Sequence, residues 1–314
     1  MSQHSGRSDL EVPRATGEAA TKDTLVERTV RLVIRDGINV NLSEDGFMNL
    51  THLVITSRLA DIFVLASLAV EQATNLAHCV LKLQNVVVPA SASLIQSHGS
   101  HTVTNTSLRH LSLESMPEWG PENALVLFLD RMCLPGLDIL EFKGLTLNTW
   151  GPRPFSPIGV ATSFLERSAC ALSELKFDLC YGWEHDFIKF LGHSTFNSLR
   201  TLHLDEAPVT EIFFKLLVEK TSKGRSTPSL FLPNLKRITY RGEKDFWWDA
   251  ILKVVKAHQY PRKRKYLRPL MSLEVETYED GLMEEPAKYP FWTVVQNFKS
   301  GVTKVSWKFR YNIL

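Results

Sequence analysis

The sequence repeats one short pattern: leucine, two residues, leucine, one residue and a bulky apolar side chain. In CALSELKFDLC the pattern occupies residues 172–177, and it returns 27 residues later in SLRTLHLDEAP at 199–204. Cys79 and Ile238 replace the second leucine in two other copies. Successive copies begin 26 to 36 residues apart, and such self-similarity is the signature of a repeat architecture. The eight copies lie at 50–55, 76–81, 108–113, 137–142, 172–177, 199–204, 235–240 and 270–275.

The residues between the copies follow a helical period instead. Apolar side chains recur three and four positions apart, as expected for helices with one buried face. Within each copy, the last two pattern residues are two positions apart and therefore face the same side of a strand. That apolar side needs cover from the following helix and from neighbouring units, which stacking provides. The predicted helical segments are 122–133, 159–170, 185–194, 209–220 and 245–259.

We therefore predict an α/β, leucine-rich-repeat-like solenoid with parallel strands on the concave face and helices on the convex face. Residues 1–22 are polar and are expected to form a disordered tail. Residues 23–314 are expected to form a single solenoid with about eight recognisable repeats and terminal caps. A degenerate strand or cap is predicted within 29–41, and a last strand within 302–309. The segment TSKGRSTPS, at 221–229, is predicted to be a flexible insertion.

Several longer stretches resemble the repeat half of fungal F-box-like proteins. They are FLERSACALSELKF, DFIKFLGHSTFNSLRTLHLDE, FLPNLKRITYRGE and FWWDAILKVVKAH, and the resemblance covers roughly residues 45–310. The resemblance implies substrate recognition for a cullin-type ubiquitin ligase. The three-helix F-box, which opens with a Leu-Pro pair, has no counterpart in residues 1–50. A ubiquitin-ligase adaptor is therefore expected as a partner only if an F-box is missing from this chain.

Polar residues alternate with the pattern positions and are predicted to point away from the core, onto the concave face. In-register stacking would bring Glu114, Glu141, Lys176 and His203 close together. The face is interpreted as a surface that recognises a protein partner, against the alternative of an ordinary solvated sheet face. The candidate partner-binding residues are His110, Glu114, Glu141, Lys143, Glu174, Lys176, Asp178, His203, Asp205, Arg237 and Arg241.

A second hypothesis rests on the basic segment YPRKRKYLR at 260–268. Such a run suits a nuclear protein associated with nucleic acid. We favour a solvated loop, because the net charge is only +2 and the middle strands are modestly acidic, which opposes nucleic-acid binding. The residues of this basic patch are Arg262, Lys263, Arg264, Lys265 and Arg268.

Enzyme motifs do not occur in the sequence: it has no Gly-rich phosphate loop, no G-x-S-x-G and no H-E-x-x-H. No catalytic residue, cofactor site or metal site is therefore expected. His110 and His203 are interpreted as equivalent positions of two repeats, where exposed polar residues are favoured over a metal or acid–base role. The four cysteines lack paired spacing, which argues against zinc and disulfides and for small buried side chains.

Residues 1–22 lack the apolar stretch of a secretory signal, and we expect no segment to span a membrane. The longest apolar run, LADIFVLASLAV at 59–70, contains Asp61 and is too short to cross a bilayer. Without export, the glycosylation-type sequons at Asn41, Asn49 and Asn105 carry no meaning. We expect a cytoplasmic or nuclear protein with no membrane partner.

Overall fold

The computed structural model describes thirteen stretches of the chain with gaps between them. The predicted tail at 1–22 lies outside them, so the disorder expected there stays a prediction. The described residues are 30–34, 47–57, 62–83, 102–115, 128–144, 157–180, 182–218, 220–221, 229–243, 245–246, 248–259, 270–278 and 304–310.

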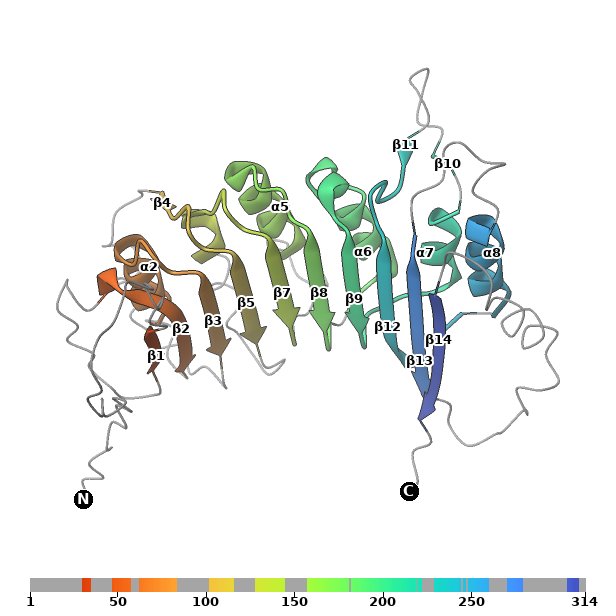
Figure 1. The fold of residues 1–314 in the computed structure, drawn as a ribbon, viewed down its shortest axis with the longest axis horizontal. Coiled ribbons are helices and arrows are strands. Elements are labelled where there is room, and N and C mark those ends of the chain that lie inside the picture. The colour runs from red at the N-terminus through yellow and green to blue at the C-terminus, as the bar shows by residue number, and fades with distance from the viewer. Residues whose placement is uncertain are drawn as a thin grey trace, which may run out of the picture.

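Ten strands form one open parallel sheet in which each strand lies next to the previous one in chain order (Figure 1). All eight copies of the leucine pattern enter this sheet, and the strands predicted within 29–41 and 302–309 complete it. The prediction of an α/β fold built on a large parallel sheet is confirmed. The strands are β1 (Val30–Ile34), β2 (Leu50–Ser57), β3 (His78–Leu83), β5 (His110–Ser115), β7 (Ile139–Lys143), β8 (Glu174–Asp178), β9 (Thr201–Asp205), β12 (Arg237–Glu243), β13 (Ser272–Tyr278) and β14 (Lys304–Arg310).

The helices lie together behind the sheet in the view of Figure 1. Four of the five predicted helical segments contain a helix, and of 122–133 the structure describes 128–133, which are helical at 128–131. Helix α2 arises from the apolar run at 59–70, for which no helix was predicted. The helices are α2 (Ile62–Gln72), α5 (Pro157–Ser168), α6 (Glu184–Leu191), the short 3-10 helix η1 (Ser194–Ser198), α7 (Glu211–Leu216) and α8 (Trp248–Gln259).

Two small pairings supplement the large sheet. Strand β4 (Val103–Thr104) runs parallel to β6 (Met132–Cys133). Strands β10 (Lys220–Thr221) and β11 (Ser229–Leu230) are antiparallel, so the two ends of the predicted insertion pair with each other. The residues between those ends lie outside the described part of the chain.

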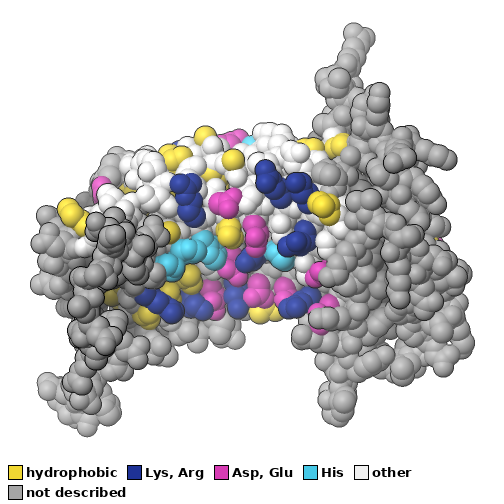
Figure 2. All heavy atoms as spheres, viewed as in Figure 1, with side chains coloured by type: hydrophobic (Ala, Val, Ile, Leu, Met, Phe, Trp, Pro, Cys, Tyr) yellow, Lys and Arg dark blue, Asp and Glu magenta, His cyan; other side chains and the backbone are white. Residues whose placement is uncertain are grey.

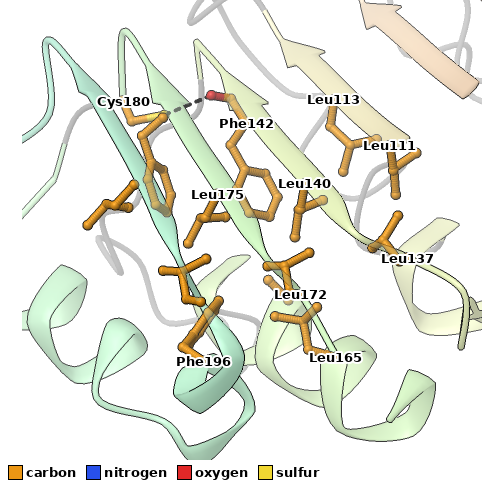
Figure 3. Close-up of a cluster of buried hydrophobic side chains, with 14 of the residues drawn as sticks. Leu111, Leu113, Leu137, Leu140, Phe142, Leu165, Leu172, Leu175, Cys180 and Phe196 are labelled. Carbon is orange, nitrogen blue, oxygen red and sulfur yellow. Dashed lines mark hydrogen bonds between the residues drawn. The ribbon is translucent and has the colours of Figure 1, made fainter. Parts of the chain in front are cut away.

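The core lies between the sheet and the helices, while the opposite face of the sheet is turned toward the viewer in Figures 1 and 2. All three pattern positions in all eight copies are buried, and the most exposed of them, Leu270, shows 4% of its surface. Figure 3 shows how Leu140 and Leu175 stack in register above Leu165 of α5. Burying such side chains from water contributes about 1.5–3 kcal/mol each before entropy is counted.

A cluster of phenylalanine side chains fills the core between the middle of the sheet and α6. Phe177 of β8 packs against Phe142 of β7 with ring centroids 5.6 Å apart. It also meets Phe187 and Phe190 of α6 edge-on, at 4.9 and 6.2 Å. Edge-to-face aromatic pairs add to the energy of burial, so this cluster joins β7, β8 and α6.

The entrances of the strands repeat one backbone contact. In each unit from β5 to β13, two consecutive N–H groups donate to a single carbonyl oxygen of the preceding unit, at 2.7–3.1 Å. Arg109 and His110, for example, both donate to Ala77. Because six successive units share this contact, the strands enter the sheet in the same register each time.

The residue before the first leucine of a copy also contacts the preceding unit. Asn75 and Asn234 donate side-chain N–H groups to the carbonyls of Met48 and Asn197, at 2.8 and 2.7 Å. Gly136 occupies the corresponding place before Leu137, where a Cβ atom would stand 2.2 Å from the carbonyl oxygen of Thr106. The close approach to the preceding unit therefore favours glycine at position 136.

Candidate functional site

The open face, which we define as the sheet face opposite the helices, carries three rows of side chains. The pairing register sets these rows, because every second residue of a strand faces this side. Row one contains Arg31, His52, His78, His110, Ile139, Glu174, Thr201, Arg237 and Ser272. Row two contains Val33, Val54, Val80, Ser112, Glu141, Lys176, His203, Thr239 and Glu274. Row three contains Thr56, Lys82, Glu114, Lys143, Asp178, Asp205, Arg241 and Glu276.

All eleven predicted partner-binding residues fall in these rows. Glu141, Lys176 and His203 are direct neighbours in row two, as the sequence predicted. Glu114 stands instead in row three, opposite Lys143. Figure 2 shows acidic, basic and histidine side chains gathered over the middle of this face.

Most charges of row three are matched by a neighbour on the next strand. Lys82 Nζ lies 2.8 Å from Glu114, and Lys143 Nζ lies 3.0 Å from Asp178. The Asp178 carboxylate, by its hydrogen bond and its charge, raises the pKa of Lys143 against the opposing effect of burial. The pairs hold the long side chains in defined positions on the open face.

Arg241 extends row three toward the carboxyl-terminal strands. Its Nε lies 3.2 Å from Glu276 of β13, and its Nη1 lies 3.8 Å from Asp205 of β9. Arg241 keeps 42% of its side chain exposed, whereas Glu276 keeps only 8%. The guanidinium therefore remains accessible to solvent while carboxylates on both sides set its orientation.

Glu174 joins rows one and two. Its Oε1 lies 3.1 Å from Lys176 Nζ on the same strand and 3.5 Å from His203 Nε2 on the next. Burial lowers the pKa of His203; the charge of Glu174 opposes this effect, while Lys176 and Arg237 reinforce it. At neutral pH this part of the face therefore presents a neutral imidazole beside a paired carboxylate.

A row of three histidines crosses β2, β3 and β5, and of these the sequence analysis had singled out only His110. The rings of His52 and His78 are stacked, with centroids 4.4 Å apart and planes 8° apart. The Nδ1 atoms of His78 and His110 are 3.4 Å apart. Burial is the largest cause that lowers the pKa of His78, and the neighbouring His52 and His110 lower it further. These contacts build one continuous imidazole surface.

The predicted equivalence of His110 and His203 is wrong. His110 follows its first leucine, Leu108, by two positions, whereas His203 follows Leu199 by four. His110 therefore stands in row one opposite His78, and His203 stands in row two opposite Lys176. The correct signal was the motif L-x-H, which three successive copies carry at 50–52, 76–78 and 108–110.

The histidine row ends at a carboxylate. His110 Nε2 is buried and lies 3.6 Å from Oε2 of Glu141, which is longer than a regular hydrogen bond. The proximity of His110 is the largest cause that lowers the pKa of Glu141; burial opposes it, and Ser112 and Lys176 assist. An ionised Glu141 can thus accept a charged contact from His110 whenever that ring is protonated.

The described ranges contain neither a cluster of metal-ligating side chains nor a disulfide. No group of three or more His, Cys, Asp or Glu side chains there is arranged to hold a metal ion. None of the four cysteines, all of which lie in the described ranges, forms a disulfide; Cys79 and Cys180 are buried and the other two are partly exposed. Burial raises the pKa of Cys79 to about 12 and that of Cys170 to about 11, so both thiols stay protonated.

The basic patch at Arg262, Lys263, Arg264, Lys265 and Arg268 lies outside the described residues. The nucleic-acid hypothesis therefore stays a prediction. Among the described helices, none combines the length and the apolar character needed to cross a membrane.

Comparison with known proteins gives no family for this chain. No protein-family model matches its sequence, and no curated protein matches it significantly. The resemblance to F-box-like proteins accordingly remains a prediction from the quoted motifs.

Proposed function

We propose that the chain is a leucine-rich-repeat-like solenoid whose open face recognises a partner protein, without catalysing a reaction itself. The single observation that carries this proposal is the register of the sheet, which aligns polar side chains in three rows along consecutive parallel strands. A row of this kind offers many alternating contacts to one extended or convex partner. A stable complex would bury on the order of 1,200–2,000 Å² in total.

The chemistry of the face suits proteins better than nucleic acid. In β7, β8 and β9 the three rows combine the acidic residues Glu141, Glu174, Asp178 and Asp205 with the basic residues Lys143 and Lys176. A phosphate backbone would be repelled by this surplus of carboxylates. A protein partner can instead match both signs of charge, which gives specificity and speeds association.

We further propose the role that the family resemblance implies, namely substrate recognition for a cullin-type ubiquitin ligase in the cytoplasm or the nucleus. The basis is the order of the FLERS, LPNLK and late-helix motifs along the chain. A pull-down with the purified chain tests this role, because recovery of a ligase adaptor from the extract is the expected result. Recovery of other proteins without any adaptor would remove the ligase role and leave the recognition role intact.

Site-specific photo-crosslinking tests the recognition role itself. A benzophenone amino acid at Lys176, in row two, is expected to capture a partner protein in cell extract. The matched control carries the same group at Lys189, which is exposed on α6 in the helical layer. Capture of the same protein with equal efficiency at both positions, or at Lys189 alone, would refute recognition through the open face.

A further inference from the structure

The amino-terminal part of the open face differs in character from its middle. We define the histidine patch as Arg31, His52, His78 and His110 of row one, together with the three valines beside them in row two. Four successive strands thus place a cationic or protonatable group at the same register position. Further along the row the next residue is Ile139, so the run of basic groups ends at β7.

The valines supply an apolar strip along the histidines. Val33 of β1 is 41% exposed, and Val54 and Val80 are half-buried. The register places these three side by side on β1, β2 and β3. An occupant of the patch would therefore meet an imidazole or guanidinium row and an apolar row running in parallel.

The charged groups around His78 are few and identifiable. Strand β1 contributes Arg31, β2 contributes His52, β3 itself contributes Lys82, and β5 contributes His110. Glu114 and Glu141 are the carboxylates of rows two and three nearest to the patch among the described residues. Each already faces a cation or histidine, Glu114 at Lys82 and Glu141 at His110. The free charge that the patch offers to a ligand is therefore positive.

We propose that the histidine patch binds an acidic segment of the partner protein, one that alternates carboxylate and apolar side chains, and that His78 gains a proton when the segment binds. This inference rests on the proposed recognition function and adds the chemistry of the partner. An extended segment places successive side chains on opposite sides. Carboxylates and apolar groups could then lie over row one and row two respectively when the segment crosses the strands.

The stacked rings explain why binding and protonation are linked. In the free protein a proton on His78 is opposed by burial and by the two neighbouring rings. A carboxylate placed over the row offsets that penalty, because an opposite charge nearby favours the protonated ring. Affinity therefore rises as the pH falls, by at most about tenfold per pH unit for each proton taken up.

The test uses the full chain and a synthetic probe. The probe is an end-capped, fluorescently labelled octapeptide in which Glu and Val alternate, and the control probe alternates Lys and Val. Fluorescence anisotropy is measured at pH 7.5, 6.5 and 5.5 in low salt. We expect the Glu probe to bind at least about fivefold more tightly at pH 5.5 than at pH 7.5, within the limit of one linked proton. The Lys probe is expected to show no measurable binding.

Two variants test whether the pH dependence of Glu-probe binding comes from the histidine patch. In the double variant His52→Gln and His78→Gln, affinity for the Glu probe is expected to lose its pH dependence. The matched control His203→Gln removes a histidine from row two of the same face, outside the patch, and is expected to keep that dependence. Far-ultraviolet circular dichroism verifies that each variant is folded at each pH.

The inference is overturned if the Glu probe fails to bind, if both probes bind equally, or if the double variant retains the full pH dependence. These failures differ from a failure of the proposed function. If a partner is crosslinked at Lys176 but the Glu probe does not bind, the recognition role stands and the ligand proposed for the histidine patch is rejected. Conversely, pH-linked probe binding would support the patch even if no partner is captured at Lys176.

Discussion

The Nδ1 atoms of His78 and His110 lie 3.4 Å apart, on neighbouring strands of the sheet. A hydrogen bond between these nitrogens requires the tautomers in which one carries a hydrogen and the other accepts the bond, because two N–H groups would repel each other at this distance. The contact continues on one side to the ring of His52 and on the other to Glu141. Protonation of any ring in this run therefore changes the energy of its neighbours.

This relationship predicts the titration of His78. Its pKa is expected below the ordinary value of 6.5, and His52→Gln is expected to raise it because one repelling neighbour is lost. Histidine signals followed by NMR from pH 8 to pH 4.5 give both values, and His203→Gln serves as the control that leaves His78 unchanged. A His78 pKa at or above 6.5 in the unmodified chain would contradict the geometry.

The lowered pKa of His78 also determines how the free energy of unfolding changes with pH. A depressed pKa means that the unfolded state binds more protons than the folded state between the two pKa values. The contribution of His78 is therefore fully present above pH 6.5 and is lost as the pH falls toward its folded pKa. Urea unfolding at pH 7.5 and 5.5 is expected to show a smaller pH-dependent loss in His78→Gln than in the unmodified chain.

Asn105 is predicted to be a major buried polar contributor to stability. Its side-chain N–H groups donate to the carbonyls of Val70 and Ala73, at 2.8 and 3.0 Å. Its oxygen accepts from the N–H groups of Ser107 and Leu108, both at 2.9 Å. Asn105→Ala leaves these backbone groups without their partner and is expected to lower the free energy of unfolding by about 2–4 kcal/mol.

Asn75→Ala is the matched control for Asn105→Ala. Asn75 makes one exposed hydrogen bond, to the carbonyl of Met48, so its loss is expected to cost about 1 kcal/mol or less. Denaturant unfolding of both variants gives the comparison. Equal losses would show that the side chain of Asn105 does not join the end of α2 to the turn that leads into β5.

A side chain at Gly136 is predicted to destabilise the folded chain. The Cβ of Gly136→Ala would stand 2.2 Å from the carbonyl oxygen of Thr106, so the backbone must move, at a cost of about 1–3 kcal/mol. At Gly192, which ends α6 with ordinary helical dihedrals, the nearest atom is 3.2 Å away. Gly192→Ala is expected to cost clearly less in thermal unfolding. A Gly136→Ala variant as stable as the unmodified chain would contradict the close contact between successive units.

The sheet could be predicted from the sequence because its signal is local and repeated. The second position of the repeated pattern is a buried leucine in most copies, for example Leu53, Leu111 and Leu175. Each buried parallel strand needs this pattern, so it recurs in every unit. Helix α2 was missed because its apolar run lacks a clear polar face, so that the run was considered only as a membrane span and excluded as too short. The role of Asn105 was also hidden, since its partners Val70 on α2 and Ala73 directly after α2 are 35 and 32 residues away in sequence.

The polar rows could be predicted only in part. Alternation placed all eleven candidate residues on the open face, but the alignment between units depends on counting from the first leucine of each copy. That count failed for His110 and His203, and it left His52 and His78 unnoticed. Pairings such as Lys143 with Asp178 depend on rotamers and neighbouring strands, which the pattern alone does not specify.

The affinity of the captured partner for charge-reversed chains tests the central claim most directly. The face variant combines Glu141→Lys with Asp178→Lys, and the control carries Glu211→Lys, which is exposed at the start of α7 in the helical layer. Calorimetry is expected to show at least about a tenfold loss of affinity for the face variant, since like charges across an interface cost several kcal/mol. The control is expected to stay near the unmodified value. Unchanged affinity in a folded face variant, or a loss confined to Glu211→Lys, would contradict recognition through the open face.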